Sequence, residues 1–188
     1  MKIGALSVVV FDNVFGTSIP MRTSREAIED QQDNRRFYQM QTMMFHQNPT
    51  WGILKYSAYG CNCHYMVGDR PMSTPGYGQA IDDLDAVCKD HKSCLNCAEA
   101  EYGEECINEF TRYDFDIVAA DGIVCMDAAG SCGRALCECD KKFAAEHYQY
   151  HEVYDNVFNN VYAGFPYQDV CRKYIQFKLQ LKLYNIIA

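Results

Sequence analysis

The sequence predicts a mainly α-helical, disulfide-rich fold with an extension at each end. Its eleven cysteines lie between Cys61 and Cys171, a density typical of proteins that form disulfides in an oxidising compartment. The stretches 82–96 and 136–150 have the character of helices. A chain of 188 residues with 48% hydrophobic content is long enough to build one domain with a substantial core.

Zinc is the competing explanation for the cysteines, because Cys61-x-Cys63-His64 and Cys94-x-x-Cys97 are short enough to chelate a metal. No second pair with finger-like spacing follows at a suitable distance, so we expect disulfides. An odd number of cysteines leaves at least one thiol free or bonded to another molecule. The leftover cysteine is therefore a clue about assembly.

The net charge is −8, and the chain contains no basic run. These features argue against nucleic acid as a partner and against attraction to an anionic membrane surface. No segment of the sequence approaches the length of a transmembrane helix.

Three regions follow one another along the chain. Residues 1–35 form an extension whose apolar run up to Phe11 is typical either of a short secretory signal or of a retained β-strand. Within this extension, Thr23-Ser-Arg-Glu26 is a capping box and predicts the start of a helix. Residues 36–172 form the domain. Residues 173–188 form a tail in which apolar and polar side chains alternate, which predicts a strand.

The first part of the domain combines a helix and a loop. Apolar side chains between Phe37 and Met44 repeat at helical spacing, which predicts a helix with one apolar face that starts near Arg36. Glycines and prolines are frequent over residues 60–78, so a loop is expected there.

The rest of the domain is predicted to contain two helices separated by a β-hairpin. The first helix runs from Asp82 to about Asn96, with acidic residues that favour its N-terminus. The hairpin joins Phe115–Ala119 to Ile123–Cys125. The second helix runs from Leu136 to about Tyr150.

One histidine and one aspartate are candidates for chemistry. If Cys94 bonds Cys139, the two helices are held together with His91 and Asp140 within reach of each other. A carboxylate on one ring nitrogen fixes the tautomer and leaves the other nitrogen free to take a proton from water. From spacing alone, a buried histidine paired with an acid for structural reasons is the simpler interpretation.

Several motifs occur in the order found in one known family. They are Tyr59-Gly-Cys61-x-Cys63, Asp82-x-x-Asp85, Cys88-x-x-His91 and the cysteine run from Cys125 to Asp140. Each motif is weak alone, but together the chain resembles secreted phospholipase A2 over roughly Phe37 to Cys171. The resemblance implies two long antiparallel, disulfide-linked helices, a small β-wing and a calcium-loop-like segment. It also implies that His91 and Asp140 activate water against the sn-2 ester of a phospholipid.

The resemblance further implies a set of disulfides. The implied pairs are Cys61–Cys171, Cys63–Cys88, Cys94–Cys139, Cys106–Cys132 and Cys125–Cys137. Five bridges leave Cys97 over, so we expect an intermolecular disulfide or a free thiol at this position.

The chain departs from the family's pattern where calcium would bind. An aspartate that supplies carboxylate oxygens to calcium is expected after the histidine, but Lys92 stands there. The loop is also degenerate, with Asn62, His64 and Met66 at its positions, and residues other than glycine restrict the conformation that wraps the ion.

Two further positions are assigned by resemblance to substrate binding. They are Tyr59 and Leu95, and Leu95 stands where the family is expected to have a tyrosine. No cofactor is expected, unless the protein is active, in which case the cofactor would be calcium.

We therefore expect a secreted, extracellular phospholipase A2-like protein without calcium-dependent hydrolysis, which acts as a structural, assembly or lipid-binding module. Its expected partners are a homo- or hetero-oligomer and a phospholipid or fatty acid. The first alternative is an active phospholipase A2 that uses His91 and Asp140. The second alternative is a membrane-active toxin without hydrolysis, which the acidic composition disfavours.

Overall fold

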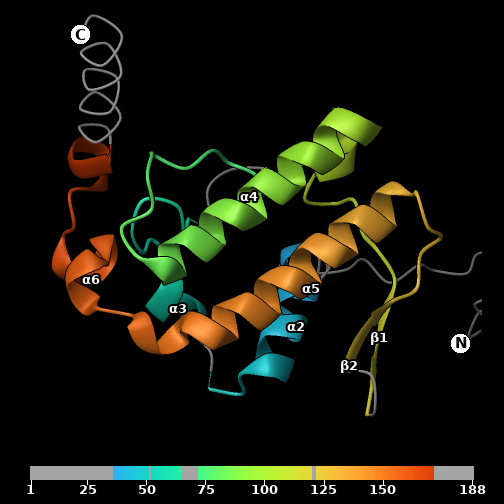
Figure 1. Ribbon diagram of the computed structural model, residues 1–188, viewed down its shortest axis with the longest axis horizontal. Coiled ribbons are helices and arrows are strands. Elements are labelled where there is room, and N and C mark those ends of the chain that lie inside the picture. Colours follow the sequence, from blue (N-terminus) through green and yellow to red (C-terminus); the bar gives the residue numbers. More distant parts are fainter. Residues whose placement is uncertain (1–35, 51, 65–71, 120–121, 172–188) are drawn as a thin grey trace, which may run out of the picture.

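The computed structural model describes residues 36–50, 52–64, 72–119 and 122–171 (Figure 1). The capping box at Thr23, the tail over residues 173–188 and Met66 lie outside these residues, so the predictions for them stay predictions. The domain boundaries expected at residues 35 and 172 also stay predictions.

Helix α4, Asp83–Tyr102, is the first long helix. Asp82 caps it, because its side chain accepts a hydrogen bond from the Asp85 backbone N–H at 2.8 Å. The helix continues past Asn96, where the prediction ended, to Tyr102, and Gly103 follows it as the C-cap. The φ of Gly103 is +89°, a conformation that glycine adopts readily, and this ends the helix.

Helix α5, Cys132–Tyr150, is the second long helix of the described chain. It begins earlier than the predicted start at Leu136, because the Ser131 hydroxyl accepts a hydrogen bond from the Arg134 N–H at 3.2 Å. Figure 1 shows α4 (green) and α5 (orange) side by side and running in opposite directions. The antiparallel pair that the resemblance implies is therefore confirmed.

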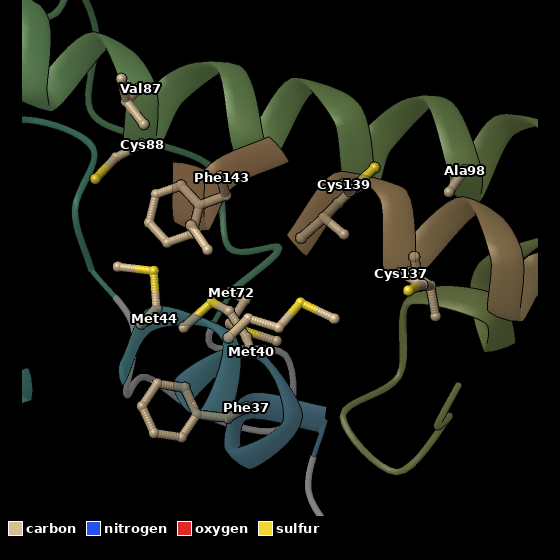
Figure 2. Close-up of a cluster of buried hydrophobic side chains, with 14 of the residues drawn as sticks. Phe37, Met40, Met44, Met72, Val87, Cys88, Ala98, Cys137, Cys139 and Phe143 are labelled. Carbon is tan, nitrogen blue, oxygen red and sulfur yellow. The ribbon is translucent and has the colours of Figure 1, made fainter. Parts of the chain in front are cut away.

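Helix α2, Arg36–Gln47, packs against α5 and forms one side of the hydrophobic core. Phe37, Met40, Met43 and Met44 on its apolar face are at most 2% exposed, as the sequence repeat predicts. In Figure 2 Phe37, Met40 and Met44 gather with Met72 from the loop before α4 and with Phe143 of α5. Met43 belongs to the same cluster.

The predicted hairpin is also confirmed. Strands β1, Phe115–Val118, and β2, Gly122–Cys125, pair antiparallel within the described residues, with Phe115 opposite Cys125 and Val118 opposite Gly122. Several short elements are not predicted by the sequence. They are helices α3, Ile53–Tyr56, and α6, Asn160–Ala163, and the 3₁₀ turns Glu104–Ile107, His151–Val153 and Asn156–Phe158. Across the described segments, no helix combines the length and the apolar character needed to cross a bilayer.

All eleven cysteines belong to the described residues, and ten of them form five disulfides. The bonds are Cys61–Cys171, Cys63–Cys88, Cys94–Cys139, Cys106–Cys132 and Cys125–Cys137. These are the pairs that the resemblance implies. Cys94–Cys139 joins α4 to α5, and Cys61–Cys171 spans a sequence separation of 110 and encloses the other four bonds. Cys97 is exposed and has no disulfide partner among these cysteines.

Candidate active site

A histidine of α4 and a carboxylate of α5 meet between the two helices. His91 Nε2 lies 2.6 Å from Asp140 Oδ1, and His91 is only 4% exposed. Phe143, one turn further along α5, stacks on the imidazole with the ring centroids 4.3 Å apart. The structure thus brings together the two residues that the sequence singles out for chemistry.

Tyr113, in the segment before β1, supports this pair. Its hydroxyl donates to Asp140 Oδ2 at 2.8 Å, so both oxygens of that carboxylate have a partner. Gln39 of α2 holds the backbone of Tyr113, because its side chain accepts from the Tyr113 N–H and donates to the Tyr113 carbonyl. Burial and the adjacent Asp140 carboxylate raise the pKa of Tyr113 well above its ordinary value, so the hydroxyl remains a donor.

This arrangement defines what the pair can do chemically. An aspartate whose position is fixed holds the imidazole in one orientation and one tautomer. The other ring nitrogen of His91, Nδ1, is then the atom that can accept a proton from a water molecule.

The His91–Asp140 pair offers little surface to a substrate. His91 is 4% exposed and Asp140 is 0% exposed. The neighbouring Phe143 belongs to a buried hydrophobic cluster that also contains Met72 and Met40 (Figure 2). Described residues border one cavity of about 510 Å³ beside Pro75–Gly78 and another of about 330 Å³ beside Cys61 and Cys171. Neither cavity is lined by His91 or Asp140.

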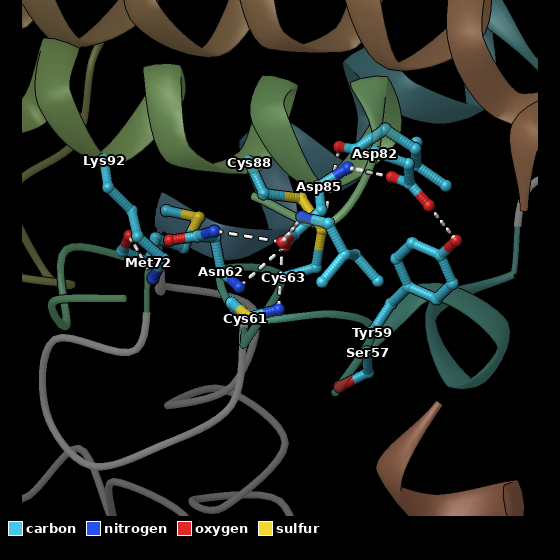
Figure 3. The surroundings of a disulfide bond; sticks show 12 residues. Ser57, Tyr59, Cys61, Asn62, Cys63, Met72, Asp82, Asp85, Cys88 and Lys92 are labelled. Carbon is cyan, nitrogen blue, oxygen red and sulfur yellow. Dashed lines mark hydrogen bonds between the residues drawn. A yellow bond between two sulfur atoms is a disulfide. The ribbon is translucent and has the colours of Figure 1, made fainter. Parts of the chain in front are cut away.

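Asp85 organises the loop that precedes α4 (Figure 3). Its Oδ2 accepts hydrogen bonds from Cys61 N at 3.0 Å, Ile81 N at 3.1 Å and Asn62 Nδ2 at 3.1 Å. Its Oδ1 accepts from Asn62 N at 2.7 Å. Burial raises the pKa of Asp85 above its ordinary value, against the opposing effect of these donors. Both oxygens of the Asp85 carboxylate therefore act as hydrogen-bond acceptors for N–H groups of the loop.

Gly60 allows the close approach of backbone and carboxylate. Its φ is +59°, and a Cβ at this position would lie 2.5 Å from Asp85 Cγ. Only glycine accommodates both the left-handed conformation and this contact.

Lys92 binds the backbone of the same loop at Met72 and Thr74. Its Nζ donates to the carbonyl oxygen of Thr74 at 2.6 Å and to that of Met72 at 3.4 Å. Figure 3 shows the lysine reaching from α4 towards Met72. The side chain is 6% exposed, and burial lowers its pKa to about 8, partly offset by the Asp85 carboxylate.

His64 stands at a loop position where the family is expected to have glycine. It is 8% exposed, and its ring centroid lies 5.2 Å from that of Tyr77 and 4.8 Å from that of Tyr167. Burial, together with the charge of Lys92, lowers the pKa of His64 to about 4. The imidazole is therefore neutral at pH 7.

The described charged groups of this loop are already engaged by the chain itself. Calcium takes about six to eight oxygen ligands, including carboxylates. In the part of the chain that the structure describes, no three His, Cys, Asp or Glu side chains are grouped to hold a metal. The Asp85 oxygens accept four hydrogen bonds, and the Lys92 ammonium lies against the loop carbonyls.

The two residues assigned to substrate binding are buried. Tyr59 and Leu95 are both 0% exposed. The Tyr59 hydroxyl donates to Asp82 Oδ2 at 2.5 Å and accepts from Asp155 N at 3.3 Å, while Leu95 packs in the main hydrophobic cluster. Neither side chain lines the two cavities, and their role in substrate binding stays a prediction.

Sequence patterns do not single out Tyr113, Phe143 or Met72. Tyr113 is 27 residues from Asp140, so no local spacing connects them. Phe143 lies three residues after Asp140, and helical periodicity is a signal that could have placed it beside the aspartate. Met72 lies in a segment rich in glycine and proline, where no periodic pattern indicates which side chain is buried.

The fold and the site together define a class of protein: disulfide-linked, mainly helical, with a buried histidine–aspartate pair between its long helices. A family model described as phospholipase A2 matches residues 37–157. This chain belongs to the phospholipase A2 family.

Named relatives agree with this assignment. Basic phospholipase A2 beta-bungarotoxin A5 chain of Bungarus multicinctus is 34% identical over 110 residues, which cover 57% of this chain and 70% of that protein. The A-AL4 chain of Bungarus multicinctus and the A4 chain of Bungarus candidus are each 35% identical over 95 residues, or 50% of this chain. These matches cover 59% and 55% of the two relatives, which is less than two thirds of their length.

Proposed function

We propose that this chain is a secreted phospholipase A2-like protein that lacks calcium-dependent hydrolysis and acts as a structural, assembly or lipid-binding module. The observation that carries the proposal is the position of Lys92. Its buried ammonium donates to the carbonyl oxygens of Thr74 and Met72. A positive charge that belongs to the chain itself repels a second cation and occupies oxygens that could otherwise face one.

The loss of a metal would have a large effect on ester hydrolysis. In the active family, calcium is the electrophile that stabilises the oxyanion formed when water attacks the ester. Removing a single oxyanion-stabilising group typically lowers the rate by about 100- to 1,000-fold. Without this group the His91–Asp140 pair keeps its hydrogen bond, and it then serves packing between α4 and α5.

A second candidate function is favoured by the intact pair itself. His91, Asp140 and Tyr113 keep a geometry suited to activating water, with contacts of 2.6 Å and 2.8 Å. An active phospholipase A2 would use this pair on the sn-2 ester, with calcium as cofactor. Membrane damage without hydrolysis has less support, because the chain carries a net charge of −8 whereas the relatives are named basic phospholipases.

Calorimetric calcium titration combined with hydrolysis of mixed phospholipid vesicles tests the proposal. We expect no calcium-binding heat at millimolar calcium, and a hydrolysis rate no higher than that of the His91→Gln variant. A calcium-dependent secreted phospholipase A2 in the same vesicles serves as the positive control. Calcium-dependent turnover that disappears in His91→Gln would contradict the proposal and support the second candidate.

Assembly through Cys97 is a further part of the proposal. This cysteine is exposed on α4 and lies outside the five disulfides of the described chain. An odd cysteine in a secreted protein suggests pairing with another molecule. On non-reducing electrophoresis we expect a disulfide-linked homo- or hetero-oligomer that the Cys97→Ser variant no longer forms. A monomer band with one titratable thiol would argue against this linkage.

A further inference from the structure

We infer that Tyr102, the last residue of α4, is a site of tyrosine O-sulfation. Four glutamates surround it in the sequence, namely Glu99, Glu101, Glu104 and Glu105. The sulfotransferases that modify tyrosine bind an anionic donor, 3′-phosphoadenylyl sulfate, and carboxylates beside the tyrosine complement the basic cleft that this donor requires. These enzymes work in the secretory pathway, so the inference rests on the proposed secretion of the chain.

The hydroxyl of Tyr102 lies at the surface. The ring is half-buried, because it packs against the main hydrophobic cluster, while the hydroxyl end is exposed. Helix α4 ends directly after it, at Gly103, whose φ is +89°. A Cβ on this glycine would meet no atom of the described chain within 4 Å, so the space beside the tyrosine is open. Figure 1 shows this end of α4 projecting at the upper right, where an enzyme can reach the hydroxyl from solvent.

The glutamates oppose the dipole of α4. The C-terminal end of a helix carries partial negative charge, so cations are favourable in the last turn and carboxylates are unfavourable. Helix α4 has Glu99 and Glu101 in this turn and no basic residue. Among the ion pairs of the described residues, none involves Glu99, Glu101 or Glu105. Recognition by a basic partner gives these carboxylates a role that the stability of the helix does not.

Glu101 also sets the protonation state of the hydroxyl. Its carboxylate accepts a hydrogen bond from Tyr102 and thereby raises the pKa of this tyrosine, so the phenol carries its proton. In the transfer, the phenolic oxygen bonds to the sulfur of the donor while the bond from this sulfur to the phosphate oxygen breaks. Adenosine 3′,5′-bisphosphate leaves, and the phenolic proton passes to a base of the enzyme. The product is a sulfate ester that adds one permanent negative charge beside the glutamates.

Two other tyrosines show which features are specific to Tyr102. Tyr162 is 54% exposed and also lies near the end of a helix, α6, but no acidic residue is within five positions of it. Tyr154 has acidic neighbours in the sequence, but its ring packs against those of Tyr56 and Tyr59, with the centroids 5.4 Å and 4.9 Å apart. Tyr102 combines a surface hydroxyl with acidic flanks.

Expression of the full chain behind a supplied secretion signal in cultured animal cells tests the inference. Mass spectrometry of the secreted protein should show one added sulfo group. Chlorate, which inhibits synthesis of the donor, should prevent this addition, and alkaline phosphatase should not remove it, whereas a phosphate would behave in the opposite way. Because the signal is supplied, the result does not depend on whether the natural chain is secreted.

A second assay uses a purified tyrosine sulfotransferase with the donor and unmodified protein whose disulfides are intact. Intact disulfides matter because the Cys106–Cys132 bond holds the chain close to Tyr102. The folded protein should accept one sulfo group.

Three variants locate the modification. Tyr102→Phe should abolish the added group in both assays. The double variant Glu101→Gln, Glu105→Gln keeps the tyrosine and should lower the rate with the purified enzyme by about tenfold or more, because it removes two complementary charges. Tyr162→Phe is the matched control and should be modified like the wild type. Both glutamates are exposed, so their substitution leaves the fold intact, which circular dichroism verifies.

Each outcome decides the inference. Sulfation in either assay that is lost in Tyr102→Phe and reduced in the double glutamine variant supports it. An unmodified protein in both assays, or sulfation that survives Tyr102→Phe, would overturn it. Equal rates for the wild type and the double glutamine variant, or modification only after the disulfides are reduced, would also overturn it.

Discussion

Replacing Asp85 by asparagine is expected to lower the free energy of unfolding by about 3–5 kcal/mol. The carboxylate accepts three backbone N–H groups, from Cys61, Asn62 and Ile81, and the Asn62 side-chain amide. An asparagine keeps one acceptor oxygen and turns an NH₂ group towards donors that are buried. Each buried donor left unpaired costs about 1–3 kcal/mol.

Denaturant unfolding at pH 7 with the disulfides intact measures this effect. Asp83→Asn is the matched control, because Asp83 is exposed in the first turn of α4. It loses only a helix-dipole interaction of about 0.3–1 kcal/mol. Equal shifts of the unfolding midpoint in the two variants would show that the Asp85 hydrogen bonds contribute little to stability.

Acidification from pH 6.5 towards pH 4 is expected to destabilise the protein through two buried histidines. One is His64 of the loop, whose pKa is lowered to about 4. The other is His147 of α5, which is 1% exposed and packs edge-to-face on Tyr56 with the ring centroids 4.5 Å apart. Burial, followed by the charges of His151 and Lys55, lowers the pKa of His147 to about 3.

The sign follows from the number of protons bound in each state. Between the unfolded pKa of 6.5 and the folded values of about 4 and about 3, the unfolded chain binds protons that the folded protein does not. Stability is therefore fully present above pH 6.5 and is lost as the pH falls. Each histidine contributes a slope of up to about 1.4 kcal/mol per pH unit, which by pH 4 amounts to roughly 3 kcal/mol for each of His64 and His147.

Scanning calorimetry between pH 7 and pH 4 tests this expectation through differences between variants. His147→Phe and His64→Phe keep an aromatic ring but cannot be protonated, so each should lose less stability on acidification than the wild type. His46→Gln is the control, because His46 is exposed near the end of α2. Identical pH profiles for the wild type and both phenylalanine variants would mean that carboxylates alone cause the acid sensitivity.

The long elements of the fold could be predicted because their own side chains carry the signal. The apolar repeat of α2 and the turn residues of the hairpin are local patterns, and the structure confirms both elements. Short helices carry too few residues for such a pattern and depend on tertiary contacts. Asn159 accepts the first N–H groups of α6 and donates to the Lys55 carbonyl, which is 104 residues away.

The candidate site was predictable in its side chains but not in its backbone partners. His91 and Asp140 are visible in the sequence, and the Cys94–Cys139 bond explains why they meet. The unusual Lys92 is visible too. The sequence does not indicate that its ammonium binds the Thr74 carbonyl, because every residue carries a carbonyl and only the path of the loop decides which one is near.

The Cys61–Cys171 bond also has a mechanical consequence. It closes the chain between these cysteines into a covalent ring that contains α4, α5, the hairpin and the other four disulfides. Tension applied to the two ends of the chain crosses from Cys61 to Cys171 through this single bond and bypasses the ring. Pulling would detach α2, which lies before Cys61, while the helices that carry His91 and Asp140 remain unloaded.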